Sequence, residues 1–416
     1  MIYIYIELPD GYTAFGGRKY AKLKKSLYGL KQGAKDWYDH QNKFLTEVVG
    51  FERSTMDRCF YVYKKDNVTC LLYVHVDDYI LACDSDEFFQ HFLLEFSKYT
   101  TFDSDVTDLG TPKNHMQIAL DYVLSESDNT LTLSNQRYIL QTLARFGMQD
   151  CTPKYAPLPT KLQLPYGQKP TCEATYRAII GCLLWIARTL RPDIMYATVF
   201  LSQFVTCATA EHLVAAKHIL RYLKATYDRT ITFRRNEMLD FIKDTRQMTI
   251  TAYSDSDFGS DTSDSKSFTG YLLYVNGHLV DWVTRKQGLV ATSTTEAEYI
   301  ALCEYTKSAL HIYQLLAEYF PTDYPILVNC DSESAQKMAE NNLTSRRTKH
   351  ILIVYRFITD WIDKNLFKLI HVDTTVNLAD YMTKVPQNVN FVERSKALFR
   401  SLVHHSHTVH KVALVT

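Results

Sequence analysis

The sequence lacks the features that mark membrane-spanning, secreted and zinc-ribbon proteins. Its 46 basic and 46 acidic side chains leave no net charge on 416 residues, and no apolar run is long enough to cross a bilayer. Residues 1–10 include Glu7, Pro9 and Asp10 where a signal peptide needs an apolar core. Nine cysteines are scattered without a C-x-x-C pair, which argues against a disulfide framework and a zinc site and for a reducing compartment. We therefore expect a protein of two to four globular domains that is intracellular and not secreted.

The charge is unevenly distributed along the chain. Between Gly16 and Lys35 there are seven basic residues and no acidic one. Tyr20 and Tyr28 lie among them, and such rings can stack on bases while cations hold phosphates. A solvated basic face explains the same composition, and from this segment alone it is slightly favoured.

The pattern of the first half of the chain predicts a helix over 34–49 and a hairpin of strands 59–63 and 68–76. A third strand, 79–83, directly follows Asp77-Asp78. Two carboxylates at a tight turn repel each other unless they are solvated or share a cation. Further elements are a strand at 131–133, a helix over 135–146, a proline-rich boundary at 151–170, and helices over 172–189, 194–206 and 210–226, with Asp193 as the expected cap of the second.

The second half predicts a mixed sheet covered by helices. Asn276-Gly277 is a strong hairpin signal, and Ser293-Thr294-Thr295-Glu296 is a capping box before a long helix. Ser332 and Asn377 are candidate caps of later helices. The expected order is strands 248–255, 268–275 and 278–284, a helix to about 319, strand 325–330, helices 333–340 and 348–364, strand 367–372 and a short final helix.

Four acids stand at the ends of four of these elements: Asp255, Glu298, Asp331 and Asp380. Four carboxylates that converge from separate elements suit a pair of Mg²⁺ ions that clamp the attacking water and the leaving oxygen of a phosphodiester. Each acid alone is more often a solvated or helix-capping residue, so the prediction depends on all four.

Several motifs together resemble the Pol polyprotein of copia-type long-terminal-repeat retrotransposons. In the first half they are residues 23–32 (LKKSLYGLKQ), Val76-Asp77-Asp78, residues 135–139 (NQRYI) and residues 176–193. In the second half they are residues 252–259 (AYSDSDFG), 267–271, 293–299 (STTEAEY), 330–332, 347–351 (RTKHI) and 377–380 (NLAD). The matches run in the family's order from about Tyr3 to Lys384.

The resemblance implies an α+β chain in four parts. These are a partial reverse-transcriptase palm and thumb (1–160), a helical connection (161–245), a mixed α/β ribonuclease H-like domain (246–386) and a C-terminal tail (387–416). It implies that Asp255, Glu298, Asp331 and Asp380 bind Mg²⁺, with Mn²⁺ as an alternative, and cut the RNA strand of an RNA–DNA hybrid. It also implies that Asp77 and Asp78 are palm metal ligands, and that the chain acts in a cytoplasmic particle or the nucleus.

The same resemblance changes the interpretation of the basic segment. Template–primer contacts are implied for Lys24, Lys25, Tyr28, Gly29, Lys31 and Gln32, with His350 as a structural or phosphate-contacting residue. We also expect metal to neutralise the acids Asp255, Asp257, Asp261 and Asp264.

Departures from the family pattern limit the expected activity. The family's third palm Asp and its fingers precede the segment that matches Met1–Gly11, so DNA synthesis is expected to be weak unless an upstream Pol segment supplies them. The alternatives are a non-catalytic nucleic-acid-binding remnant and a purely structural one. A tail with His404, His405, His407 and His410 suggests a disordered end more than a metal site.

Overall fold

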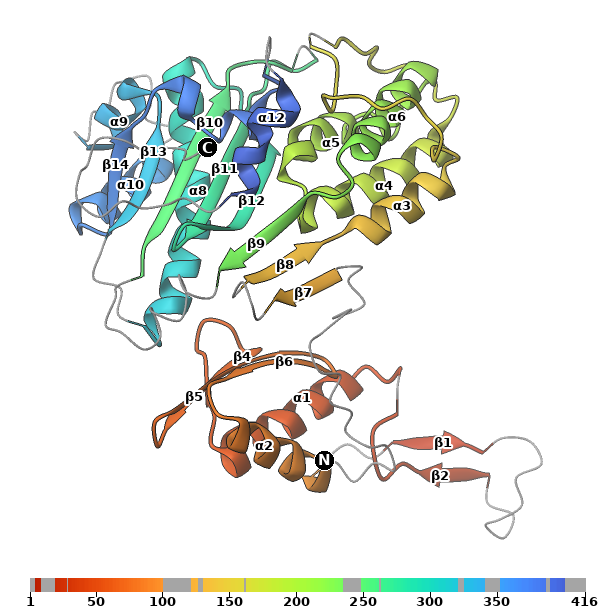
Figure 1. Cartoon of the computed structure of the whole chain (residues 1–416), viewed down its shortest axis with the longest axis vertical. Coiled ribbons are helices and arrows are strands. Elements are labelled where there is room, and N and C mark those ends of the chain that lie inside the picture. Colours follow the sequence, from red (N-terminus) through yellow and green to blue (C-terminus); the bar gives the residue numbers. More distant parts are fainter. Residues whose placement is uncertain are drawn as a thin grey trace. The chain divides into compact units, whose positions relative to one another are not determined.

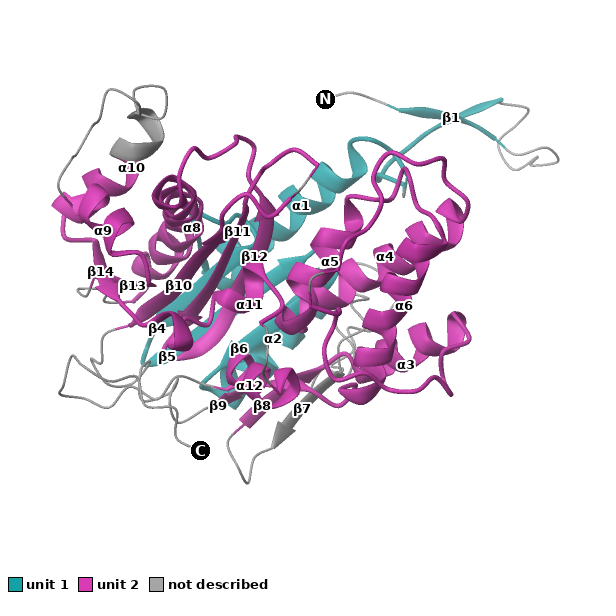
Figure 2. Cartoon of the chain, turned by 90° about the horizontal axis from the view of Figure 1, so that it is seen from above, with its two compact units in different colours: residues 1–110 teal, residues 111–416 magenta. Residues whose placement is uncertain are grey.

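The computed structural model describes residues 4–8, 19–27, 29–99, 121–125, 130–160, 162–234, 248–261, 263–320, 325–340, 352–386 and 390–400. These residues belong to two units, residues 1–110 and residues 111–416, which Figure 2 colours separately. The division into four parts at residues 160, 245 and 386 stays a prediction. In the described part of the chain no helix is both long and apolar enough to cross a membrane.

The first unit is a small antiparallel sheet with helices on one face. Its strands lie in the order β3 (Glu52–Arg53), β4 (Phe60–Lys65), β5 (Val68–His75) and β6 (Asp78–Cys83). Helix α1 (Gly33–Lys43), which continues as a π-helical turn (Phe44–Val49), and α2 (Asp86–Tyr99) pack on it through Phe44, Leu45 and Phe92. Strands β1 (Tyr5–Glu7) and β2 (Tyr20–Lys22) form a separate pair (Figure 1). The predicted helix and hairpin are confirmed.

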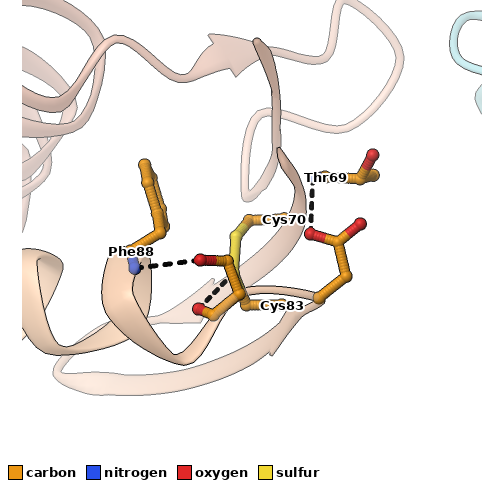
Figure 3. Close-up of a disulfide and its surroundings, with 6 residues drawn as sticks. Thr69, Cys70, Cys83 and Phe88 are labelled. Carbon is orange, nitrogen blue, oxygen red and sulfur yellow. Dashed lines mark hydrogen bonds between the residues drawn. A yellow bond between two sulfur atoms is a disulfide. The ribbon is translucent and has the colours of Figure 1, made fainter. Parts of the chain in front are cut away.

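A disulfide bond joins Cys70 on β5 to Cys83 on β6 (Figure 3). The two residues are directly opposite each other in the antiparallel register. Near them the Thr69 amide donates to the Asp84 carboxylate at 2.8 Å, and the Phe88 amide donates to the Ser85 hydroxyl at 3.2 Å. The sequence argues against a disulfide framework and does not reveal this single bond, because strand pairing brings together two residues that are 13 positions apart. The other seven cysteines are free.

The second unit contains a five-stranded mixed sheet in the order β12-β11-β10-β13-β14. Strands β10 (Ile250–Asp257), β11 (Phe268–Val275) and β12 (His278–Lys286) are antiparallel, and β13 (Ile326–Cys330) and β14 (Phe367–His371) extend the sheet in parallel from β10. Alternation along β10 sends Ala252 to one face and Tyr253 to the other. This is the mixed sheet that the sequence predicts for this part of the chain.

Helices cover both faces of that sheet. Helices α8 (Thr294–Ala317), α9 (Glu333–Glu340) and α10 (Leu352–Asp363) bury one face. The other face shares a core with α3 (Gln136–Arg145), α4 (Glu173–Thr189), α5 (Met195–Ser202), α6 (Ala210–Ala225) and α11 (Asp380–Thr383) (Figure 1). The Trp282 indole on β12 donates to the Ala187 carbonyl on α4 at 2.8 Å. Helices α3 to α6 and this face of the sheet therefore form one continuous hydrophobic core.

Two further features join segments that belong to different predicted parts of the chain. Strands β7 (Asp121–Ser125), β8 (Thr130–Ser134) and β9 (Thr230–Arg234) form one sheet, which links residues on both sides of position 160. The stretch predicted as a tail begins with α12 (Phe391–Ser395) and a 3₁₀ turn (Lys396–Phe399), whose Phe391 and Leu398 are buried in the core of the unit.

Asp193 does not cap a helix as predicted. It lies buried in a 3₁₀ turn (Pro192–Ile194) and pairs with Arg191 and Arg229, both at 2.8 Å, while the Tyr222 hydroxyl donates to it at 2.6 Å. Burial raises the pKa of Asp193, but the two guanidinium groups outweigh it and lower that pKa. Arg229 also donates to the Val392 carbonyl at 2.6 Å, so this buried charge network holds α12 in place.

Candidate metal centre

Asp255 lies near the end of the central strand β10, where its side chain is only 2% exposed. Its neighbour across the strand pair is Gly270 on β11. The Thr383 hydroxyl, at the end of α11, donates a short hydrogen bond to Asp255 Oδ2. The sheet therefore supplies one acid, and a short helix is held directly against it.

A glycine makes this close approach possible. A Cβ on Gly270 would lie 2.4 Å from Cβ of Met382 and 2.9 Å from Cγ2 of Thr383. The Thr284 hydroxyl on β12 donates to the Met382 carbonyl at 2.6 Å, which fixes the helix on the sheet. Any larger residue at position 270 would push α11, and with it Asp380, away from Asp255.

The other three acids reach the same place: Glu298 from α8, Asp331 from the position just after β13, and Asp380 from the start of α11. Oxygen atoms of Asp255, Asp331 and Asp380 all lie within 4.8 Å of one another, and Glu298 and Asp331 meet the same limit together with the Cys330 sulfur. The Ser256 amide donates to Glu298 Oε1 at 3.2 Å, whereas Glu298 Oε2 is buried without a hydrogen-bond partner. We call Asp255, Glu298, Asp331 and Asp380 the acid tetrad.

The surroundings of the acid tetrad penalise its negative charge. Burial raises the pKa of Asp255 to about 7; the Lys384 ammonium opposes this rise and the Asp380 carboxylate adds to it. Burial also raises the pKa of Glu298 well above its ordinary value, and the charges of Asp255 and Asp331 raise it further. Burial raises the pKa of Asp380 as well. Clustered buried carboxylates of this kind are stabilised in their charged form by a bound cation.

The donor set of the acid tetrad fits a hard divalent cation. It offers carboxylate oxygens, including the buried and unpartnered Glu298 Oε2, which is the ligand type that Mg²⁺ prefers. The Cys330 sulfur is not suited to the same role, because burial raises its pKa and keeps the thiol protonated.

Two residues at this centre, Thr383 and Lys384, are not predicted from the sequence. The Lys384 ammonium lies 2.9 Å from Asp380 Oδ1. Position 384 lies four residues after Asp380, one helical turn away, and that spacing is the signal that could have indicated the pair.

Metal is not needed to neutralise Asp261 and Asp264, contrary to expectation. The Lys286 ammonium lies 2.5 Å from Asp261 and 3.0 Å from Asp264, and it also donates to the side chain of Gln203, the residue after α5, at 2.7 Å. Lys286 therefore holds the loop between β10 and β11 against the helices of the second unit.

In the first unit, Asp77 is exposed in the turn between β5 and β6, and Asp78 is the half-buried first residue of β6. The preceding Val76 has a positive φ of 58°, and its carbonyl accepts hydrogen bonds from Trp37 Nε1 at 2.7 Å and Gln41 Nε2 at 2.6 Å. Helix α1 therefore fixes the shape of this turn. Groups of three or more candidate metal ligands occur, among the described residues, only in the second unit.

The predicted nucleic-acid contacts precede α1. Lys24, Lys25 and Lys31 are exposed, and Gln32 is the half-buried residue before the helix. Gly29 is exposed with a φ of +94°, a conformation that favours glycine. Tyr28 and His350 lie outside the described residues, as do His404, His405, His407 and His410.

Comparisons with known proteins agree with the resemblance seen in the sequence. Residues 1–160 match the family described as "Reverse transcriptase (RNA-dependent DNA polymerase)". The retrovirus-related Pol polyprotein from transposon RE1 of Arabidopsis thaliana is 34% identical over 92% of this chain, and that from transposon TNT 1-94 of Nicotiana tabacum is 31% identical over 92%. The chain spans only 25% and 28% of the lengths of these two relatives.

Solved structures show weaker similarity. LC11-RNase H1, isolated from compost, covers 32% of this chain and 92% of its own, with 16% identity and a TM-score of 0.27. The foamy viral protease-reverse transcriptase in complex with RNA/DNA hybrid covers 64% of this chain and 31% of its own, with 12% identity and a TM-score of 0.32.

Proposed function

This chain belongs to the Pol polyproteins of copia-type retrotransposons, and on that basis we propose that its second unit is a metal-dependent ribonuclease H. The observation that carries the proposal is the meeting of Asp255, Asp331 and Asp380 within 4.8 Å, with Glu298 beside Asp331. The proposed reaction is hydrolysis of the RNA strand of an RNA–DNA hybrid.

In this proposal the acid tetrad holds Mg²⁺, or Mn²⁺ in its place. The bound metal would activate a water and stabilise the charge on the leaving oxygen of the phosphodiester. Asp255 and Asp380 contribute oxygens whose positions are set by Thr383 and by the packing of α11 over Gly270. Glu298 contributes its unpartnered Oε2 from α8.

We assign the first unit a supporting role in nucleic-acid binding. Exposed Lys24, Lys25 and Lys31 can contact phosphates. The turn with Asp77 and Asp78 can contribute carboxylate ligands to the metal site of a polymerase palm. We also propose an intracellular site of action, in a cytoplasmic particle or the nucleus.

The test is cleavage of an RNA–DNA hybrid that is labelled on either strand. The purified chain should cut only the RNA strand, and only with Mg²⁺ or Mn²⁺, whereas Asp331→Asn should leave the hybrid intact. A non-catalytic remnant predicts a different result: binding that weakens steeply with salt, but no cleavage at any metal concentration. Equal activity of the wild type and Asp331→Asn would also refute the proposal.

A further inference from the structure

The acid tetrad already contains a cation of the chain itself. The Lys384 ammonium lies 2.9 Å from Asp380 Oδ1, and Asp380 is one of the three aspartates whose oxygens lie within 4.8 Å of one another. Across the described residues, this is the one ion pair that any of the four acids makes. Lys384 therefore lies where a positive charge offsets several carboxylates at once.

The backbone that carries Lys384 is held by contacts on both sides of the site. Its amide donates to the Asp380 carbonyl at 3.1 Å. The preceding Thr383 donates to Asp255, and the carbonyl of Met382 accepts from Thr284 at 2.6 Å. The ammonium is therefore placed beside the tetrad by the fold.

The side chain of Lys384 nevertheless has room to leave. It is 43% exposed, whereas the side chain of its partner Asp380 is only 16% exposed. A rotation about its flexible stem would carry the ammonium into solvent. Asp380 cannot make the same move, because it starts the short helix that is packed over Gly270.

An ammonium and a divalent metal ion are both attracted to the Asp380 carboxylate, and their positive charges repel each other. We propose that Lys384 is a built-in counter-ion of the acid tetrad, which stabilises the carboxylates before metal binds and is displaced from Asp380 when metal binds. This inference rests on the proposed function, because it takes the tetrad as the metal site. It makes Lys384 a positioning residue that lowers metal affinity and stabilises the metal-free protein.

The first test compares Mg²⁺ binding by the full chain, measured by calorimetry without nucleic acid. Lys384→Met removes the charge and keeps the length of the side chain. It should bind Mg²⁺ about three- to ten-fold more tightly than the wild type, as expected when one unit charge near the site is removed. Lys384→Arg should stay within about two-fold of the wild type, because it keeps the charge.

Thermal unfolding in EDTA provides the second readout. Lys384→Met should unfold at a lower temperature than the wild type in EDTA, and the difference should shrink or reverse in saturating Mg²⁺. The matched control is Lys307→Met, which removes an exposed lysine on α8 that pairs with Glu304 at 2.8 Å, away from the tetrad. It should change neither the Mg²⁺ affinity nor the size of the Mg²⁺-induced shift.

A third measurement uses the wild type and needs no variant to fold. Lysines are acetylated with a limiting reagent and quantified by peptide mass spectrometry, with and without saturating Mg²⁺. Displacement from Asp380 should raise the labelling of Lys384 several-fold, whereas Lys307 should stay constant.

The outcomes separate this inference from the proposed function. If the wild type binds Mg²⁺ but Lys384→Met binds it equally or more weakly, the counter-ion role is overturned and the metal site stands. Unchanged or reduced labelling of Lys384 in Mg²⁺ has the same meaning. A wild type that binds no Mg²⁺ overturns the proposed metal site, and this inference with it.

Discussion

Replacing Asp255 with Asn should stabilise the metal-free protein at alkaline pH, although it should abolish cleavage. The wild-type carboxylate is 2% exposed and lies within 4.8 Å of two other carboxylates. Asparagine keeps an oxygen that can accept the Thr383 hydrogen bond, and it removes the charge. The perturbation therefore isolates the electrostatic penalty of the site from its packing.

The sign follows from the raised pKa of Asp255. The folded protein keeps this proton up to a pKa of about 7, whereas the unfolded chain releases it near the ordinary value of 3.8. The folded state thus binds more protons in between, so the contribution of Asp255 to stability falls as the pH rises through this window. Between pH 5 and pH 8 the wild type should lose about 2–3 kcal/mol relative to Asp255→Asn, at about 1.4 kcal/mol per pH unit below the folded pKa.

The measurement is the free energy of unfolding in EDTA, obtained by urea denaturation of both proteins across this pH range. The difference between variant and wild type cancels titrations that the two share, such as those of His212 and His218, whose pKa values are lowered by burial. In saturating Mg²⁺ the wild type should become the more stable of the two proteins, because only the wild type gains binding energy from the metal. A difference between variant and wild type that stays constant from pH 5 to pH 8 in EDTA, or a variant that is still the less stable protein at pH 8, would refute the reasoning.

Three further predictions concern packing, buried charge and binding. Gly270→Ala should cost about 1–3 kcal/mol in urea denaturation and weaken Mg²⁺ binding, because its Cβ would lie 2.4 Å from α11; unchanged Mg²⁺ affinity would contradict this. Arg191→Met should cost about 3–5 kcal/mol, because Asp193 would stay buried without that partner. A loss of unfolding free energy below 1 kcal/mol in Arg191→Met would argue against the charge network. Because the pKa of Asp193 is lowered in the folded state, wild-type stability should also fall as the pH drops below the ordinary carboxyl range. Changing Lys24 and Lys31 to Ala should reduce the salt dependence of hybrid binding by about two ion equivalents, and a slope equal to that of the wild type would exclude them as phosphate contacts.

Local signals in the sequence predicted most secondary structure. Asn276-Gly277 forms the turn between β11 and β12, with a positive φ at both residues. The Ser293 hydroxyl accepts from the Glu296 amide at 3.2 Å, and the Ser332 hydroxyl accepts from the Ala335 amide at 3.2 Å, so both caps are confirmed. These features depend on residues only a few positions apart, which is why the sequence reveals them.

The capping box at the start of α8 is only half formed. The Glu296 carboxylate accepts from the Thr292 amide at 2.7 Å, where the motif would direct it to the Ser293 amide. The helix still begins where predicted, because the Ser293 hydroxyl alone caps it.

Features that depend on distant contacts were missed or predicted wrongly. Asp193 looks like a cap from its neighbours alone, but Arg229 and Tyr222 arrive from other elements and turn it into a buried ion pair. The Cys70–Cys83 bond depends on strand register in the same way. The acid tetrad was predicted as a set because each acid lies at an element end, whereas Lys384 and Thr383 required the position of α11 to be known.

The most direct test of the central claim maps the products of a hybrid whose RNA and DNA strands carry different labels. The wild type in Mg²⁺ should release RNA fragments with an intact DNA strand, and Glu298→Gln should release none while it binds the hybrid as tightly. This result would show that the acid tetrad cuts RNA. RNA cleavage that persists in Glu298→Gln, or an intact RNA strand with the wild type at every Mg²⁺ and Mn²⁺ concentration, would contradict the account.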